Sequence, residues 1–318
     1  MPVKKRVCRR LLVLLCTSLS FTVPAQAFEF EFVNVGDVGT PIPDGTGTFV
    51  LLQLPAISGD IVAYRGFGGS DQDGIYKRNV FQGDTTLVTV ADRTTPVPGR
   101  IATTFSIFKP PSLHNGDIAF RGTASDGGIG VYTVIGGVLD IVADTNTLLP
   151  VGIGYFIDFG LPWIYDGKVV FRGFGNDGQS GIYTNFAGGL TAVVDTTTMI
   201  PGGVGSFVDF GFAKPGVEPS PTSLPTSTLT FDDDKFVFFG SGSDDQEGIY
   251  LAQAGTVTKI ADLGTPIPSG VGNFTNLNPS RIAAQIEEDT VFGDKPGVRS
   301  VIRCRHTFCR EVRFWRVS

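Results

Sequence analysis

The sequence predicts an all-β fold built from a repeated antiparallel unit of four strands. Two short phrases recur along the chain. The first, Asp-x-x-Thr-x-(Ile/Val/Leu)-Pro, begins at Asp37, Asp92, Asp144, Asp195 and Asp262. The second, Gly-(Ile/Val)-Tyr, ends at Tyr76, Tyr132, Tyr183 and Tyr250. Recurrence at such a spacing indicates one supersecondary unit copied along the chain. The 42 glycines and 26 phenylalanines favour turns and strands over helices.

Residues 1–27 have the pattern of a signal peptide. Five basic residues lie between Lys4 and Arg10, an apolar run too short to span a bilayer follows, and Ala25-Gln26-Ala27 forms a cleavage site. We therefore expect a protein exported to the periplasm or the cell exterior, with Phe28 as its first mature residue and no later membrane span. The mature net charge is 25 − 5 − 31 = −11, which disfavours binding to nucleic acid and to anionic lipid.

The mature chain opens on a predicted strand, Phe28–Val35, whose apolar and polar residues alternate. It corresponds to the last strand of each later repeat. A polar loop follows each repeat aspartate. Two apolar residues, three positions apart, then predict a short irregular strand; they are Phe49/Leu52, Phe105/Phe108, Phe156/Phe159, Phe207/Phe210 and Phe274/Leu277. We expect Phe156 and Phe207 to be buried at equivalent places in adjacent blades.

The next three strands of each repeat are clearer. The second strands are predicted at Asp60–Arg65, Asp117–Arg121, Lys168–Arg172 and Lys235–Phe239. The Gly-(Ile/Val)-Tyr phrase forms the third strand, and a tight turn leads to the fourth. The fourth strands are predicted at Leu87–Val90, Leu139–Val142, Leu190–Val194 and Val257–Ile260.

Four complete repeats and a fifth without its last strand predict a five-bladed β-propeller over residues 28–301. Its blades are four-stranded and antiparallel, and Phe28–Val35 completes the fifth blade, closing the ring and removing two unpaired edges. Residues 215–230, rich in Pro, Ser and Thr, read as a loop insertion. The basic tail, residues 302–318, does not resemble the repeat. A divergent last blade, an attachment tail and an altered reading frame are each consistent with it.

The repeat, read as VADTNT…PVGIGYF…DGKVVFRG…GIYT, resembles an exported bacterial tandem-repeat family of uncharacterised function. That resemblance covers about residues 36–285 and implies a β-propeller. Some family members carry PEP-CTERM sorting tails. This chain lacks such a tail, and Phe239 replaces the arginine of the other repeats. The family implies no catalytic residues.

The repeated aspartates and arginines are interpreted as structural, because a repeat makes every copy alike while a site needs one copy to differ. Each aspartate is expected to cap its own loop. Arg65, Arg121 and Arg172 are each expected to tie turns within their own blade. The repeat tyrosines are assigned the same structural role.

Turn carboxylates are the weak candidates for a metal site. Calcium could bind the oxygen-rich turns at Asp71, Asp73, Asp177, Asp244 and Asp245, although none matches an EF-hand. No other cofactor is predicted. Gly173–Gly178 spells G-x-G-x-x-G but precedes a strand, so no helix N-terminus is there to hold a pyrophosphate.

The sequence contains no recognisable nucleophile motif. His114 is interpreted as a solvated turn residue, and Cys304, His306 and Cys309 lack zinc spacing. We therefore predict a secreted, non-catalytic binding or structural module whose partner is an extracellular protein, a glycan or a surface component. The alternative is a carbohydrate-active hydrolase or lyase that uses two carboxylates at the propeller mouth.

Overall fold

The computed structural model describes residues 32–80, 86–210, 229–232, 235–243, 245–253, 255–275, 277, 285–288 and 300–303. Residues 229–232, 285–288 and 300–303 are described by their backbone. Every regular element in these ranges is a β-strand, so the all-β prediction is confirmed, and no described segment forms a helix that could span a membrane. The chain divides into two units, residues 1–33 and 34–318. In the first, the described residues are Phe32 and Val33, both exposed.

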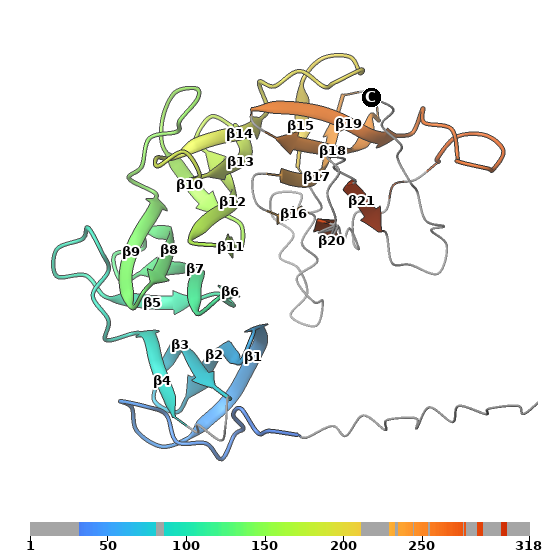
Figure 1. The fold of residues 1–318 in the computed structure, drawn as a ribbon. Coiled ribbons are helices and arrows are strands. Elements are labelled where there is room, and N and C mark those ends of the chain that lie inside the picture. The colour runs from blue at the N-terminus through green and yellow to red at the C-terminus, as the bar shows by residue number, and fades with distance from the viewer. Residues whose placement is uncertain are drawn as a thin grey trace, which may run out of the picture. The chain divides into compact units, whose positions relative to one another are not determined.

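Four antiparallel sheets follow one another along the described chain, coloured from blue to orange in Figure 1. Sheet 1 contains β1 (Phe49–Ser58), β2 (Ile61–Gly68), β3 (Asp73–Asn79) and β4 (Leu87–Asp92). Sheet 2 contains β5 (Phe105–Phe108), β6 (Ser112–His114), β7 (Asp117–Ala124), β8 (Ile129–Ile135) and β9 (Val138–Asp144). Sheet 3 contains β10 (Phe156–Phe159), β11 (Trp163–Tyr165), β12 (Lys168–Gly175), β13 (Ser180–Thr184) and β14 (Thr191–Asp195). Sheet 4 contains β15 (Phe207–Asp209), β16 (Leu229–Asp232), β17 (Lys235–Gly242), β18 (Glu247–Gln253) and β19 (Thr256–Asp262).

The first strand of the repeat differs from the prediction, because it is split in sheets 2 to 4. There, β5 and β6 both pair with β7, and the two later sheets repeat this arrangement. In sheet 1, the single ten-residue strand β1 covers the same length of β2. The predicted insertion at 215–230 falls between the two halves in sheet 4. Its residues 215–228 lie outside the described ranges, whereas Leu229 and Thr230 begin β16, so the insertion ends earlier than predicted.

A β-bulge explains the three-residue spacing of the apolar pair. Phe156 pairs with Gly175 and Asp158 pairs with Phe174, so the register shifts between Phe156 and Asp158. The same shift occurs in β1, β5 and β15. Because a bulge inserts one extra residue, positions three apart face the same side of the strand. Phe156 and Phe159 are therefore both buried.

Each sheet has an aromatic face built from the two repeat phrases. Phe156 lies edge-to-face against Tyr183, with ring centroids 4.8 Å apart, and Phe171 completes the group. The equivalent phenylalanine–tyrosine pairs lie 4.9, 4.8 and 4.9 Å apart in sheets 1, 2 and 4. Edge-to-face geometry is the preferred packing of aromatic pairs. Phe156 and Phe207 are each 1% exposed, which confirms their predicted burial at equivalent places.

The aromatic face of one sheet packs against the aliphatic face of the sheet before it. Ala119, Val131 and Ala143 of sheet 2 share a buried cluster with Phe156 and Tyr183 of sheet 3. Sheets 1 and 2 pack in the same way, and so do sheets 3 and 4. The chain therefore forms a series of face-packed antiparallel sheets, each with the topology of a propeller blade.

Two repeat glycines are required by close packing. A Cβ on Gly122 would lie 2.8 Å from Cε1 of Phe105, and one on Gly181 would lie 2.6 Å from the Val194 carbonyl oxygen. The second-strand glycines of the other sheets meet the equivalent ring, and Gly74 and Gly130 also meet a carbonyl of the fourth strand, whereas the nearest atoms to Gly248 belong to Tyr250. Conservation of these glycines across the repeats thus reflects the approach of the aromatic ring and of the fourth strand.

The fifth repeat departs from the predicted blade. The structure describes its loop as far as Leu277 and a separate hairpin of β20 (Gln285–Glu288) with β21 (Ser300–Arg303). In the described residues, no sheet joins strands from the two ends of the chain. The closing strand is not formed over residues 32–35, and residues 28–31 lie outside the described ranges. A ring of five blades is therefore not seen.

Candidate functional site

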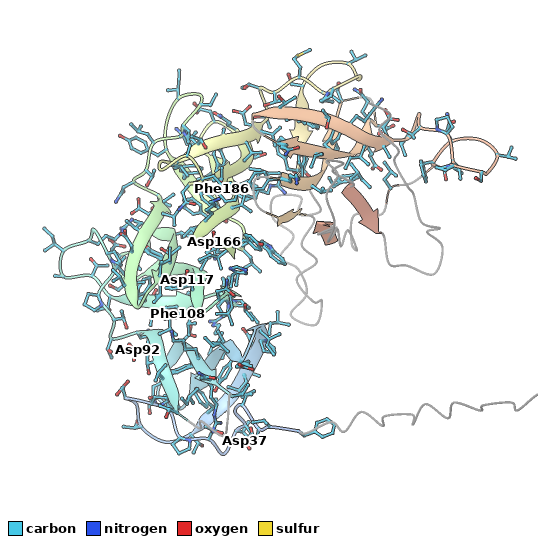
Figure 2. All side chains as sticks on the ribbon, viewed as in Figure 1. Asp37, Asp92, Phe108, Asp117, Asp166 and Phe186 are labelled. Carbon is cyan, nitrogen blue, oxygen red and sulfur yellow. The ribbon has the colours of Figure 1, made fainter. Side chains whose placement is uncertain are left out.

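The loops between sheets are the candidate functional site, and each begins with a repeat aspartate. In the third loop, Oδ1 of Asp144 accepts a hydrogen bond from the backbone N–H of Asn146 at 2.9 Å and from Oγ1 of Thr147 at 3.1 Å. The backbone N–H of Asp144 donates to Oγ1 of Thr147 at 2.9 Å. The loops at Asp37, Asp92, Asp195 and Asp262 repeat the hydrogen bond from the aspartate N–H to the threonine hydroxyl; Figure 2 labels the first two aspartates.

At Asp37 and Asp262 these hydrogen bonds favour the charged form of the carboxylate. Hydrogen bonds from Asn34, Thr40 and the Gly39 N–H keep the pKa of Asp37 below its usual value. Burial opposes the same effect at Asp262, where hydrogen bonds from Lys259 and Thr265 still lower the pKa. One oxygen of each carboxylate is committed to its own loop, so these aspartates serve as loop caps.

Beyond the cap, each loop folds back as a small hairpin. In the third loop, Leu148 forms a bridge with Tyr155, and the N–H of Leu149 donates to the carbonyl of Gly154. Leu149 and its equivalents Ile42, Val97 and Ile200 are buried and anchor the loop base to its sheet.

A glutamine from the turn between the second and third strands supports the hairpin tip. In sheet 4, Nε2 of Gln246 donates to the carbonyl of Val204 at 2.9 Å, and the N–H of Val204 donates to Oε1 at 2.9 Å. Gln72 makes the same pair with Thr46. Gln179 donates to the carbonyl of Val151. The turn and the loop tip are thus adjacent in these three sheets.

In sheet 2, different residues join the turn to the loop tip. Gly128 stands at the glutamine position, and the side chain of Arg100 fills the space that a Cβ on Gly128 would need. Arg100 pairs with Asp126 at 2.6 Å and with Asp144 at 2.7 Å. The hydrogen bond from the Gly128 N–H, with the pairing to Arg100, lowers the pKa of Asp126 against the opposing effect of burial. A cation therefore links the second tip to the third loop.

The tips themselves carry exposed aliphatic side chains at one repeated position, nine residues after the aspartate. Their exposed fractions are 96% for Ile101, 82% for Ile153, 72% for Val204 and 98% for Val271. Thr46 stands at this position in the first loop. Nearly complete exposure of four β-branched aliphatic residues at equivalent places is a property of the repeat rather than of one loop.

The calcium candidates are not brought together. Asp71, Asp177 and Asp245 are exposed in the turns of three different sheets, and Asp244 lies outside the described residues. Asp73 is buried and pairs with Arg65 at 2.7 Å. In the part of the chain that the structure describes, three or more His, Cys, Asp or Glu side chains nowhere gather in metal-binding geometry.

Arg121 and Arg172 connect sheets, which corrects the prediction that each of them acts within its own blade. Arg121 of sheet 2 pairs with Asp158 of sheet 3 at 2.6 Å. Arg172 of sheet 3 pairs with Asp209 of sheet 4; burial lowers the pKa of Arg172, and Asp209 opposes this effect. Arg65 alone pairs within its sheet, with Asp73.

The repeat tyrosines lie in the core and are inaccessible to a ligand. Tyr76, Tyr132, Tyr183 and Tyr250 are all buried. Burial raises the pKa of Tyr132, Tyr183 and Tyr250 to about 12. Among the described residues, no hydrogen-bond partner is found for the hydroxyls of Tyr132 and Tyr183. The perturbed tyrosines thus belong to the packing of the sheets.

His114 was interpreted as a solvated turn residue, but it links two sheets. Its Nδ1 accepts a hydrogen bond from the N–H of Asp166 at 2.9 Å, and its ring lies 4.2 Å from that of Tyr165. Oγ of Ser112 accepts from the N–H of Ile164 at 3.1 Å. Side chains of β6 therefore accept hydrogen bonds from an N–H group of the edge strand β11 and from that of the residue after it, which protects this edge from foreign pairing.

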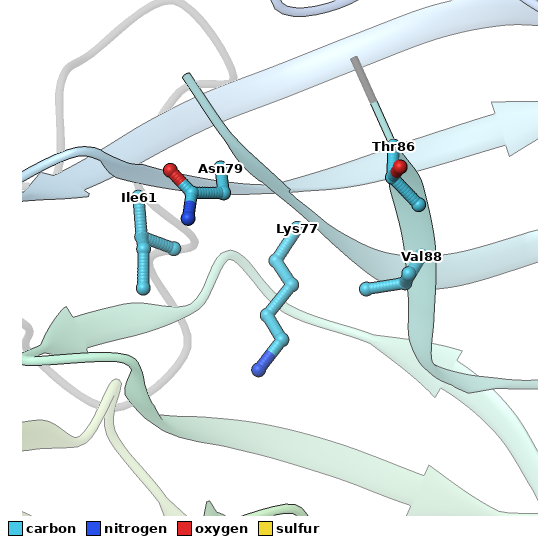
Figure 3. A pocket seen from close by; sticks show the side chains of 5 residues that line it. All are labelled: Ile61, Lys77, Asn79, Thr86 and Val88. Carbon is cyan, nitrogen blue, oxygen red and sulfur yellow. The ribbon is translucent and has the colours of Figure 1, made fainter. Parts of the chain in front are cut away.

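The described residues form cavities in sheet 1 and beside Arg100. One, of about 150 Å³, is lined by Ile61, Lys77, Asn79, Thr86 and Val88 of sheet 1 (Figure 3). The other, of about 750 Å³, lies beside Arg100 and Asp126 and extends to Tyr155 and Asn176. The first contains no carboxylate, and the second contains that of Asp126, which Arg100 neutralises. Neither holds the carboxylate pair that a glycosidase uses.

Sequence reasoning missed the aliphatic tips, although their signal is readable. The tip residue lies between small residues in Gly152-Ile153-Gly154, Gly203-Val204-Gly205 and Gly270-Val271-Gly272. An aliphatic residue between two glycines cannot be shielded by its sequence neighbours. The segment was interpreted as a polar loop, and the aliphatic residue between its glycines was overlooked.

The model of a family of unknown function, DUF7453, matches residues 30–294. No curated protein matches the chain. Among solved structures, the β-propeller domain of the Trilobed protease from Pyrococcus furiosus is 13% identical, with a TM-score of 0.40 over 67% of this chain and 58% of that one. TolB from Acinetobacter baumannii is 13% identical, with a TM-score of 0.39 and coverages of 79% and 51%. A puromycin-hydrolyzing peptidase of Mycobacterium tuberculosis is 12% identical, with a TM-score of 0.38 and coverages of 81% and 35%. The chain thus spans about a third to three fifths of these structures.

Proposed function

Because the chain belongs to the DUF7453 family, whose function is unknown, we propose its function from its own side chains. The protein is a non-catalytic binding module that contacts its partner through the loop tips. One observation carries this proposal: Ile101, Ile153, Val204 and Val271 expose the same kind of side chain at the same place in four successive loops. Exposed aliphatic side chains lower the free energy of the protein only when a partner covers them.

The charged groups of the repeat support the same function. The loop aspartates cap their own loops, and Arg121 and Arg172 pair with carboxylates of the next sheet. These groups stabilise the fold and are not available for acid–base chemistry. The aliphatic tips, in contrast, have no role in the packing of the sheets.

We further propose that the module is exported and that its sheets belong to a five-bladed propeller. The signal-peptide pattern of residues 1–27 supports export. Support for the fifth blade comes from Val35, which packs against Phe49, Tyr64 and Tyr76, just as Val90 packs against the aromatic face of sheet 2. Val35 and Val90 each lie two residues before a repeat aspartate. Mass spectrometry of the exported protein is expected to find Phe28 at the N-terminus, and an intact Met1 on that form contradicts export with cleavage.

A binding array tests the function. The purified protein and a tip variant, Ile101→Ser/Ile153→Ser/Val204→Ser/Val271→Ser, are applied to immobilised glycans and peptides with and without calcium. We expect ligands that bind the native protein and not the tip variant, and no release of products. Binding that is unchanged in the tip variant contradicts the proposal. Release of sugar fragments favours the carbohydrate-active alternative.

A further inference from the structure

The loop tips stand next to exposed carboxylates in sheets 1 to 4, and the tip is aliphatic in sheets 2 to 4. The turn that carries Asp245 is joined to Val204 through both hydrogen bonds of Gln246. The turn that carries Asp177 is joined to the loop of Ile153 through Gln179 and Val151. In sheet 1, Gln72 joins the turn of Asp71 to Thr46. In sheet 2, Arg100 pairs with Asp126 and precedes the tip residue Ile101. We call each such pair of tip and turn a tip element.

These carboxylates differ in availability. Asp71 is almost fully exposed and its nearest cation, Arg93, is 4.0 Å away and itself partly exposed. Asp177 and Asp245 are also exposed, and no hydrogen bond or ion pair is found for either carboxylate among the described residues. Asp126, in contrast, is neutralised by Arg100 at 2.6 Å. The tip elements of Ile153 and Val204 therefore combine an aliphatic tip with an unpaired carboxylate, whereas in sheet 1 the exposed Asp71 stands beside Thr46 and 4.0 Å from Arg93.

From these contacts we propose that the tip elements bind a cationic amphipathic polypeptide, in which Lys or Arg alternates with aliphatic residues. This inference rests on the proposed binding function and names its partner class. The elements of Ile153 and Val204 each provide an apolar contact and a carboxylate, and Gln179 and Gln246 join the turn that carries the carboxylate to the loop that carries the tip. The alkyl stem of Lys or Arg covers apolar surface while its charged end reaches a carboxylate. Charge complementarity then selects cationic partners and steers their approach.

Charge and residue type disfavour the other partners. The chain has a formal net charge of −6 before any cleavage, so an anionic membrane surface is repelled even though the tips are apolar. The tips carry Ile and Val, which lack the flat ring faces that stack on bases. Repetition of the element gives several weak contacts along one partner, and their combination raises the apparent affinity.

Peptide binding by fluorescence anisotropy tests the proposal with the full chain. Labelled peptides of alternating Lys-Leu, Gln-Leu and Glu-Leu are titrated with the native protein, the tip variant, and a charge variant, Asp71→Asn/Asp177→Asn/Asp245→Asn. The matched control is Val50→Ser/Ile57→Ser/Val138→Ser/Val208→Ser, which removes four exposed aliphatic side chains of the strands. Thermal melts of all variants check that they fold; because every changed side chain is exposed, no large shift is expected.

We expect the native protein and the control variant to bind the Lys-Leu peptide alike. The tip variant should bind it at least about tenfold more weakly. The charge variant should lose several-fold in affinity and much of its dependence on salt, because screening acts on exposed charges. The Glu-Leu peptide should not bind.

Other outcomes separate the two proposals. Equal binding of all three peptides, or tip-dependent binding to phosphatidylcholine vesicles in place of peptides, overturns the cationic polypeptide and leaves the binding function standing. If no peptide, vesicle or array ligand depends on the tips, both proposals fail.

Discussion

Asp73 accepts two hydrogen bonds from Arg65, at 2.9 and 2.7 Å, within sheet 1. Its Oδ2 also accepts the N–H of Phe108 from sheet 2, at 3.3 Å. Between sheets 2 and 3, Asp158 accepts hydrogen bonds from the equivalent two donors, the guanidinium of Arg121 and the N–H of Phe159. Ile107 stands at the Asp158 position in sheet 2. The carboxylate thus comes from the earlier sheet at the first interface and from the later sheet at the second, and in both places it accepts from a repeat arginine and from a backbone N–H.

This exchange predicts a rescue. Asp73→Ala leaves Arg65 buried without its partner and should cost about 3–5 kcal/mol of unfolding free energy. Ile107→Asp, added to Asp73→Ala, should restore much of it, because Ile107 is 46% exposed and its position is the one from which Asp158 reaches Arg121. Urea unfolding of both variants measures the effect. A double variant no more stable than Asp73→Ala contradicts the equivalence of the two positions.

A second prediction concerns Gly122, whose added Cβ would lie 2.8 Å from the ring of Phe105. Gly122→Ala should destabilise the protein by about 1–3 kcal/mol, as expected for overpacking of a core. Gly189→Ala is the matched control, since a Cβ there meets no atom within 4 Å. Thermal denaturation compares the two. Equal stability of the two variants would show that the ring of Phe105 moves aside at little cost.

Arg100 and Gly128 support a third prediction. Gly128→Gln alone should destabilise sheet 2, because the new side chain and Arg100 require the same space. Combined with Arg100→Gly, it reproduces the residues found in sheet 4, where Gln246 supports the tip and Gly203 lies just before it. The double variant should therefore be more stable than Gly128→Gln alone in urea unfolding. An additive loss from the two changes is the opposing result.

Periodicity in the sequence was sufficient to predict the sheets, because each strand of the repeat satisfies its own local pattern of burial. The Gly-(Ile/Val)-Tyr strand and the burial of Phe156 and Phe207 follow from that pattern. The bulge at Phe156 depends on the register between β10 and β12, and the partner of Arg121 depends on contact with the next sheet; the sequence displays neither. The tips were missed for a different reason: Ile153 lies between two glycines that cannot shield it, but the segment was interpreted only as a polar loop.

The buried tyrosines predict unfolding at high pH. Burial raises the pKa of Tyr132, Tyr183 and Tyr250 to about 12 in the folded protein, from an ordinary value of about 10. Below pH 10 these groups are neutral in both states and do not change stability. Between pH 10 and 12 the unfolded chain loses their protons first, so each tyrosine lowers stability by about 1.4 kcal/mol per pH unit. Absorbance of tyrosinate should rise together with loss of circular dichroism; a full rise before unfolding contradicts their burial.

The final prediction concerns the N-terminal segment and the closure of the propeller. The carbonyl of Val35 accepts a hydrogen bond from Oη of Tyr64 at 3.2 Å, and that of Asn34 accepts one from Arg78 at 3.0 Å. Val35 thus covers the aromatic face of sheet 1, which no preceding sheet covers in the described chain. Deletion of residues 28–35 exposes Tyr64 and removes the proposed fourth strand of the fifth blade. Deletion of residues 215–227, placed before β16, removes neither. The first deletion should lower the melting temperature by several degrees, since about 1 kcal/mol corresponds to roughly 2–4 °C at this chain length. It should also make Tyr64 accessible to iodination. Closure by this segment is refuted if the two deletion variants melt at the same temperature and Tyr64 stays unmodified in both.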